Sequence, residues 1–165
     1  GFNTNIYGGA PTLNYVTMTS VSGPDVVIVN KTLLLAIAPT GSGYNGLSTD
    51  VVPGSKLQYQ VVLKNQGTTA NSVVLEQAIP PHTAFLKGSM VITNTWGAGI
   101  TPVKEYFNGS YVADSGSTTD ASVTKIRFSF TQMKPNNSYV TLNYTVVVKW
   151  WGWIWIQSYQ LPVTS

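Results

Sequence analysis

The fold is decided by residues 52–67, which read VPGSKLQYQVVLKNQG. After the turn signal Pro53-Gly54, every second residue from Leu57 to Leu63 is apolar, and the residues between them are mostly polar. Successive side chains of a β-strand point to opposite faces, so this period of two predicts a half-buried strand. The stretch closes with Asn-Gln-Gly, a composition typical of a turn.

The same period of two continues along most of the chain, and no window shows the spacing of an amphipathic helix. Turn signals rich in Gly, Pro and Asn cut the chain into short pieces, which is typical of an antiparallel sandwich. The dipeptide Asn108-Gly109 predicts a hairpin with a type I′ turn. We predict strands near 14–21, 26–37, 57–64, 72–79, 89–95, 102–107, 110–113, 124–131, 139–149 and 153–160. The predicted core is Tyr59, Val61, Leu63, Val73, Leu75, Ile79, Phe85, Ile126, Phe128, Phe130, Leu142 and Tyr144.

The composition restricts the class of protein. Of the 165 residues only 9% are charged, against about 25% in an ordinary soluble domain. The polar surface must come from uncharged groups, since the chain has 20 Thr, 15 Ser and 12 Asn. This composition favours an extracellular wall, surface-layer or fibre protein. We therefore expect a secreted protein whose signal peptide was removed before Gly1.

Several activities are disfavoured by what the sequence lacks. It has no cysteine, a single histidine (His82) and no run of basic residues, which argues against thiol chemistry, zinc modules, Ser–His hydrolysis and nucleic-acid binding. No stretch reaches the ~18 apolar residues of a transmembrane helix. We predict no enzyme activity, no cofactor and no metal. Asp114 and Asp120 bracket a Ser/Thr-rich loop, which is either a weak calcium site or, more simply, solvated.

Residues 52–67, together with the later run ANSVVLEQAIPPHTAF at 70–85, resemble the conserved-repeat family called domain of unknown function eleven. The resemblance covers roughly residues 25–149 and includes the last two strands, within 125–149. It implies an immunoglobulin-like β-sandwich in secreted or cell-surface proteins of bacteria and archaea, without catalysis. Gln77 stands where the family has Asp, so no cation or turn role of that Asp carries over, and His82 stands near the family's usual Gly. The spacing of the family pattern is kept at Tyr59, Asn65, Gly67, Val73, Pro80 and Phe85.

Residues 1–22 precede the predicted sandwich, which spans 23–165. Glycines and prolines flank an extended, apolar piece at 13–21 on both sides. It is either the first strand of its own domain or a donor strand that fills a groove in a neighbouring subunit. The residues that such a donor strand would insert are Leu13, Tyr15, Val16, Met18 and Val21.

The C-terminal run at 149–159 places four tryptophans within six residues. Four interpretations remain open: a central strand with a few residues that cap one end of the sandwich, a subunit interface, a carbohydrate platform, or an anchor at a membrane surface. The aromatic residues concerned are Trp150, Trp151, Trp153 and Trp155.

Four Asn-x-Ser/Thr sequons are candidate glycosylation sites, and glycans there would supply hydration that the scarce charges do not. The acceptors are Asn30, Asn108, Asn136 and Asn143, of which alternation places Asn143 on the outward face of its strand. The first hypothesis is a glycosylated subunit of an extracellular filament, in which identical copies join head-to-tail by strand exchange. The alternatives are a surface-layer or adhesion module and a carbohydrate-binding sandwich.

Overall fold

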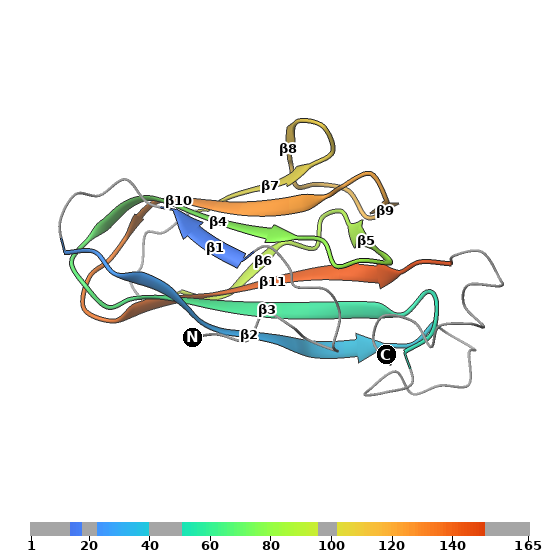
Figure 1. The fold of residues 1–165 in the computed structure, drawn as a ribbon, viewed down its shortest axis with the longest axis horizontal. Helices are drawn as coiled ribbons and strands as arrows, with labels where there is room; N and C mark the ends of the chain where they lie inside the picture. Colours follow the sequence, from blue (N-terminus) through green and yellow to red (C-terminus); the bar gives the residue numbers. More distant parts are fainter. Residues whose placement is uncertain (1–13, 18–22, 40–50, 96–101, 151–165) are drawn as a thin grey trace.

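The computed structural model describes residues 14–17, 23–39, 51–95 and 102–150. These residues form two antiparallel sheets that pack face to face as a β-sandwich (Figure 1). The first sheet has the order β1 (Asn14–Thr17), β4 (Ala70–Ala78), β10 (Lys125–Met133), β7 (Val103–Phe107) and β8 (Tyr111–Ala113). The second has the order β2 (Val26–Ile37), β3 (Lys56–Asn65), β11 (Ser138–Val148), β5 (Thr83–Leu86) and β9 (Thr119–Asp120), and β6 (Val91–Thr95) also pairs with β11. The predicted all-β sandwich is confirmed.

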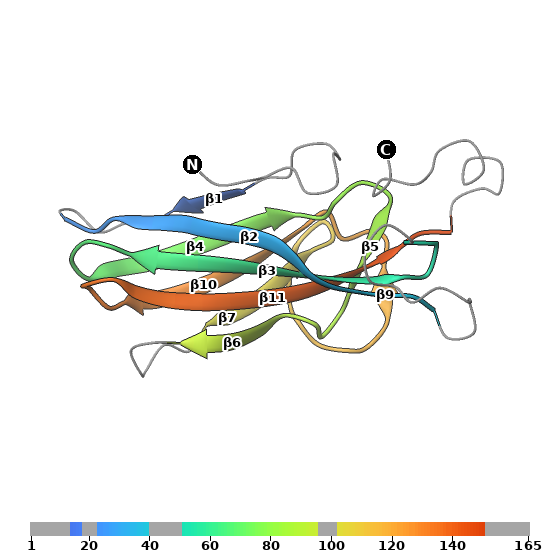
Figure 2. The ribbon, with the colours of Figure 1, turned by 90° about the horizontal axis from the view of Figure 1, so that it is seen from below.

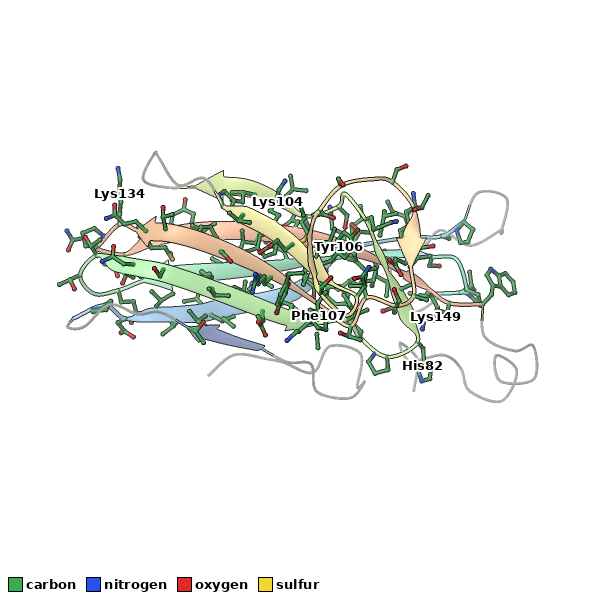
Figure 3. The ribbon with its side chains drawn as sticks, turned by 90° about the horizontal axis from the view of Figure 1, so that it is seen from above. His82, Lys104, Tyr106, Phe107, Lys134 and Lys149 are labelled. Carbon is green, nitrogen blue, oxygen red and sulfur yellow. The ribbon has the colours of Figure 1, made fainter. Side chains whose placement is uncertain are left out.

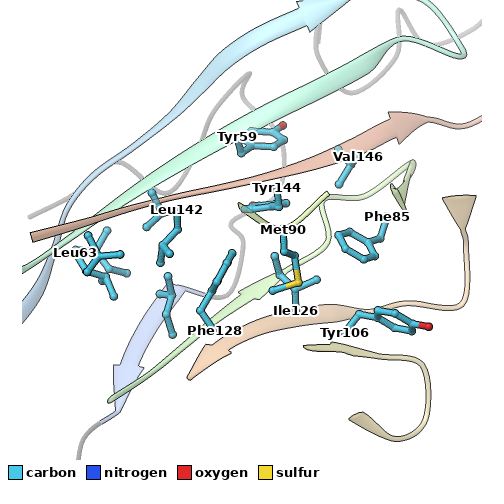
Figure 4. Close-up of a cluster of buried hydrophobic side chains, with 14 of the residues drawn as sticks. Tyr59, Leu63, Phe85, Met90, Tyr106, Ile126, Phe128, Leu142, Tyr144 and Val146 are labelled. Carbon is cyan, nitrogen blue, oxygen red and sulfur yellow. The ribbon is translucent and has the colours of Figure 1, made fainter. Parts of the chain in front are cut away.

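The core lies between the two sheets, as Figure 4 shows for the side chains around Tyr144 and Phe128. Every residue of the predicted core is buried except Ile79, which is partly buried and packs against the cluster. Tyr59 and Tyr144, directly opposite each other on β3 and β11, stack with ring centroids 5.6 Å apart. The period of two therefore sorted the side chains into inner and outer faces correctly.

Some strand predictions need correction. The short strands β5 and β9 were not predicted, because two to four residues are too few to show a period. The hairpin between β7 and β8 is present, but Phe107 pairs with Tyr111 across a loop of three residues, 108–110. Only Gly109 of the Asn-Gly pair has a positive φ, at 114°, so this loop is not the predicted type I′ turn. The predicted strand at 153–160 lies outside the described residues.

One end of the sandwich is held together by the side chain of Asn65, which is fully buried. Its Oδ1 accepts hydrogen bonds from the backbone N–H groups of Asp25 (3.2 Å) and Gly67 (3.1 Å). Its Nδ2 donates to the carbonyl oxygens of Thr68 (2.7 Å) and Lys134 (3.0 Å). Three loops that are distant in sequence thus meet on one amide, at the end where Figure 3 shows Lys134.

Gly67, two residues after Asn65, has no space for a side chain. A Cβ there would lie 1.8 Å from the carbonyl oxygen of Gly23. This close approach allows Thr68 N to donate to the same oxygen at 2.8 Å. The Asn-x-Gly spacing of Asn65 and Gly67 therefore has a physical reason in this chain.

Candidate assembly site

The outer edge of β4 carries a short strand, β1, which is separated in sequence from the rest of its sheet. β1 pairs antiparallel with β4 from Asn14 opposite Gln77 to Thr17 opposite Val74. Val16 packs against the core, whereas Thr17 is exposed. In this single chain β1 thus lies on its own sandwich, at the side where β2 also lies (Figure 2). Leu13, Met18 and Val21 lie outside the described residues, and of Tyr15 only the backbone is described.

Gln77 gives this edge an unusual buried polar group. It is fully buried and lies between Asn14 of β1 and Ile126 of β10 in the register of the sheet. Its Nε2 donates to the carbonyl oxygen of Glu76 at 2.8 Å, but its Oε1 has no hydrogen-bond partner. A buried acceptor without a donor costs about 1–3 kcal/mol, so this edge of the single chain is not fully satisfied.

The outer face of the same sheet holds an aromatic and charged cluster next to β1. The Tyr111 hydroxyl donates a hydrogen bond to Glu76 at 2.7 Å. The Nε of Arg127 donates to Glu105 at 2.9 Å. The Cζ of the same guanidinium lies 3.4 Å from the centroid of the Tyr111 ring. Burial, followed by the bond to Glu76, raises the pKa of Tyr111. The Nζ of Lys125 lies 3.6 Å from Oε2 of Glu76. The cluster includes both glutamates and the only arginine of the chain, and it fixes the β7–β8 hairpin on β10 and β4.

At the opposite sheet, the edge strand β2 buries a lysine. Lys31 is 3% exposed and pairs with the core residue Val61, and its Nζ lies 5.8 Å from the centroid of the Tyr59 ring. Burial lowers the pKa of this ammonium to about 8, so the group is charged at neutral pH. Sequence reasoning missed Lys31 because an irregularity in β2 changes its phase of alternation.

Three of the four predicted glycosylation sites lie at the surface. Asn30, Asn108 and Asn136 are exposed, and Asn136 has a positive φ of 63° in its turn. Asn143 is only 3% exposed, and its Oδ1 has no partner. It is therefore not accessible, although alternation places it on the outward face of β11. The prediction that Asn143 is a glycan acceptor at the surface of the folded chain is therefore wrong.

The two aspartates that the sequence suggested as a calcium site instead accept hydrogen bonds from backbone N–H groups. Asp114 accepts hydrogen bonds from the N–H groups of Gly88 (2.6 Å) and Met90 (3.0 Å). Asp120 accepts from the N–H of Ser122 at 2.9 Å. Within the described ranges no group of three His, Cys, Asp or Glu side chains is placed to hold a metal ion.

The turn after Pro80-Pro81 contains His82, which has a positive φ of 63°. This is the left-handed conformation that glycine adopts most readily and other residues adopt rarely. Burial, and then the nearby Lys149, lowers the pKa of His82. Figure 3 shows both residues at the same end of the sandwich.

A hollow of about 380 Å³ lies at this end. It is lined by small residues such as Gly54, Ala84 and Ala121, with Lys149 and Trp150 beside them. Trp150 is 71% exposed, and Trp151, Trp153 and Trp155 lie outside the described residues. The part of the aromatic run that is described therefore faces water.

Comparison with known protein families, with curated proteins and with solved structures finds no match. The fold defines the chain as a two-sheet antiparallel β-sandwich. In the described part of the chain there is no helix of the length and apolarity needed to cross a membrane.

Proposed function

We propose that this protein is the structural subunit of an extracellular filament and that the β4 edge is its assembly site. Residues 1–22 of one copy pair with β4 of the next copy, in the position that β1 occupies in the single chain. The copies join head-to-tail, and because this contact does not close on itself, it propagates into a fibre. The domain is immunoglobulin-like, secreted and without catalytic activity.

The observation that carries this proposal is the ladder between β1 and β4. It consists of backbone pairing over Val74–Gln77, which gives the same hydrogen bonds whichever copy supplies the strand. Val16 adds one side chain to the core from this edge. The unpartnered Oε1 of Gln77 lies at the same place and offers an acceptor to a strand inserted from outside.

A pair of cysteines distinguishes exchange between copies from pairing within one chain. Thr17 and Val74 are directly opposite each other, and the chain has no cysteine of its own. We expect Thr17→Cys with Val74→Cys to give a ladder of disulfide-linked oligomers on a non-reducing gel. Electron microscopy of the same sample should show filaments.

The matched control pairs Gln58→Cys with Thr145→Cys, which are directly opposite each other on β3 and β11 inside one sandwich. This pair should close within the chain and leave the protein monomeric under denaturing, non-reducing conditions. If the Thr17/Val74 pair also gives only monomers, β1 belongs to its own domain and the strand-exchange proposal is wrong.

We also propose that glycans coat the filament at exposed sequons, and Asn108 is the site we expect to be most accessible. All three residues of its sequon, 108–110, are exposed at the tip of the β7–β8 hairpin. In the Asn136 sequon, by contrast, Ser138 is buried and its hydroxyl donates to the Lys134 carbonyl oxygen.

Mass spectrometry of protein from the native host should therefore find a glycan on the peptide that contains Asn108 and none on the peptide that contains Asn143. Ser110→Ala removes the hydroxyl that the sequon requires and should abolish the modification, while the fold is unchanged. An unmodified Asn108 in native material would contradict this prediction.

A second candidate function is carbohydrate binding, which the hollow beside Trp150 favours. An exposed indole next to small residues and an ammonium group offers a flat face for a sugar ring and a hydrogen-bond donor. Trp150→Ala should then abolish binding in a glycan array, and filament formation should be unaffected.

A further inference from the structure

The edge strand β2 is long and apolar, a composition that favours pairing with a strand of another chain. Its twelve residues, VVIVNKTLLLAI, contain a single charged side chain, Lys31. Val29, Leu34 and Ile37 are between 43% and 49% exposed. A long apolar edge strand of this kind is a template for pairing with another chain.

Two irregularities interrupt this edge. Along β2, Ile28 pairs with Leu63 and Asn30 with Val62, so Val29 is an extra residue without a partner on β3. Leu34 is a second extra residue, between the pairs that Leu33 and Leu35 make. Bulges twist a strand and disturb the even row of backbone groups that an incoming strand needs.

The first bulge also determines where the lysine points. Val26 and Ile28 face the core, and regular alternation would turn Asn30 inward next. The extra residue Val29 shifts the phase, so Asn30 is exposed and Lys31 faces the core. A charged side chain that points inward from an edge strand is one of the features by which natural sheets resist strand addition.

The β4 edge is built differently. From Val73 to Ala78 it pairs with β10 without a register shift, and it already carries β1 over part of this length. Among the described residues no strand lies on the outer edge of β2. The β4 edge is thus regular and occupied by β1, whereas the β2 edge of the other sheet contains two bulges and a buried lysine.

From these observations we infer that Lys31 and the two bulges close the β2 edge to strand addition, so that, of the β2 and β4 edges, another copy of the chain can add a strand only at β4. The first part concerns this sandwich alone. The second part rests on the proposed function and explains why a strand from another copy would add at β4 and not at β2.

The test is Lys31→Leu, which removes the charge and leaves an apolar side chain facing the core. We expect it to fold, because burying a leucine there costs less than burying an ammonium. We expect light scattering and sedimentation to show lateral association at a concentration about tenfold or more below that of the wild type. A nitroxide label on a cysteine at exposed Val29 should show dipolar broadening in the Lys31→Leu background and none with Lys31 present.

Lys64→Leu is the matched control, since it removes a lysine from the non-edge strand β3. It should associate no more than the wild type. If Lys31→Leu folds and keeps the wild-type association state, or if Lys64→Leu associates equally, the inference is wrong. These readouts do not require filaments, so they stand apart from a failure of the cysteine ladder, which concerns β4.

Discussion

Truncation of Phe128 to alanine should lower the free energy of unfolding by about 3–5 kcal/mol, the range typical of a fully buried phenylalanine. Phe128 has no exposed surface and lies at the centre of its sheet, between Leu75 of β4 and Lys104 of β7. Figure 4 shows its ring in the layer between the two sheets, toward Leu142. Because packed strands on both sides prevent collapse of the cavity, we expect the upper half of that range.

Urea denaturation followed by circular dichroism measures this change. Gln132→Ala, at an exposed position of the same strand, is the matched control and should change stability by no more than about 0.5 kcal/mol. A loss below about 1 kcal/mol for Phe128→Ala would mean that the side chain is not in the core and that the register of β10 is shifted by one residue.

The sequence predicted the inward faces of the regular strands well, and it did so for a simple reason. Where a strand pairs without a bulge, as from Leu57 to Leu63, the period of two is kept and each side chain can be assigned to a face. In β2 the two extra residues change the phase twice, so no strict alternation can be read there. This is why Lys31 reads as a polar surface residue in the sequence and is buried in the structure.

The sequence also could not show whether the outward face of a strand is exposed to solvent or covered by other parts of the chain. Asn143 lies opposite Gln60 on β3 and Val91 on β6, on the outward face of its strand, and is nevertheless buried. Alternation distinguishes the two faces of a strand but does not tell whether the outward face is open. The same limit applies to the N-terminal segment, whose apolar residues predict an extended strand without telling which copy it pairs with.

Replacing Asn65 with alanine should cost about 3 kcal/mol or more, although it removes only a small polar side chain. The loss leaves the N–H groups of Asp25 and Gly67, and the carbonyl oxygens of Thr68 and Lys134, without the partners that they have in the wild type. Each polar group left unpaired away from water costs about 1–3 kcal/mol, and part of this is recovered where water reaches the loops. Thermal and urea unfolding measure the change, and Asn30→Ala, at an exposed asparagine, should be near neutral.

Asn65→Asp shows whether hydrogen bonding, rather than packing, makes Asn65 necessary. The aspartate has nearly the same shape and keeps an acceptor for the two N–H groups, but it places an oxygen, in place of a donor, against the carbonyl oxygens of Thr68, Met133 and Lys134. Burial and these carbonyls would raise its pKa in the folded state above the unfolded value of about 3.9. An acid whose folded pKa is raised stabilises the fold below the unfolded pKa and loses that contribution as the pH rises. The stability deficit of Asn65→Asp should therefore be large at pH 7 and shrink toward pH 4, whereas that of Asn65→Ala should show no such trend. Equal deficits for both variants at every pH would mean that the loops need the shape of this side chain and not its donor.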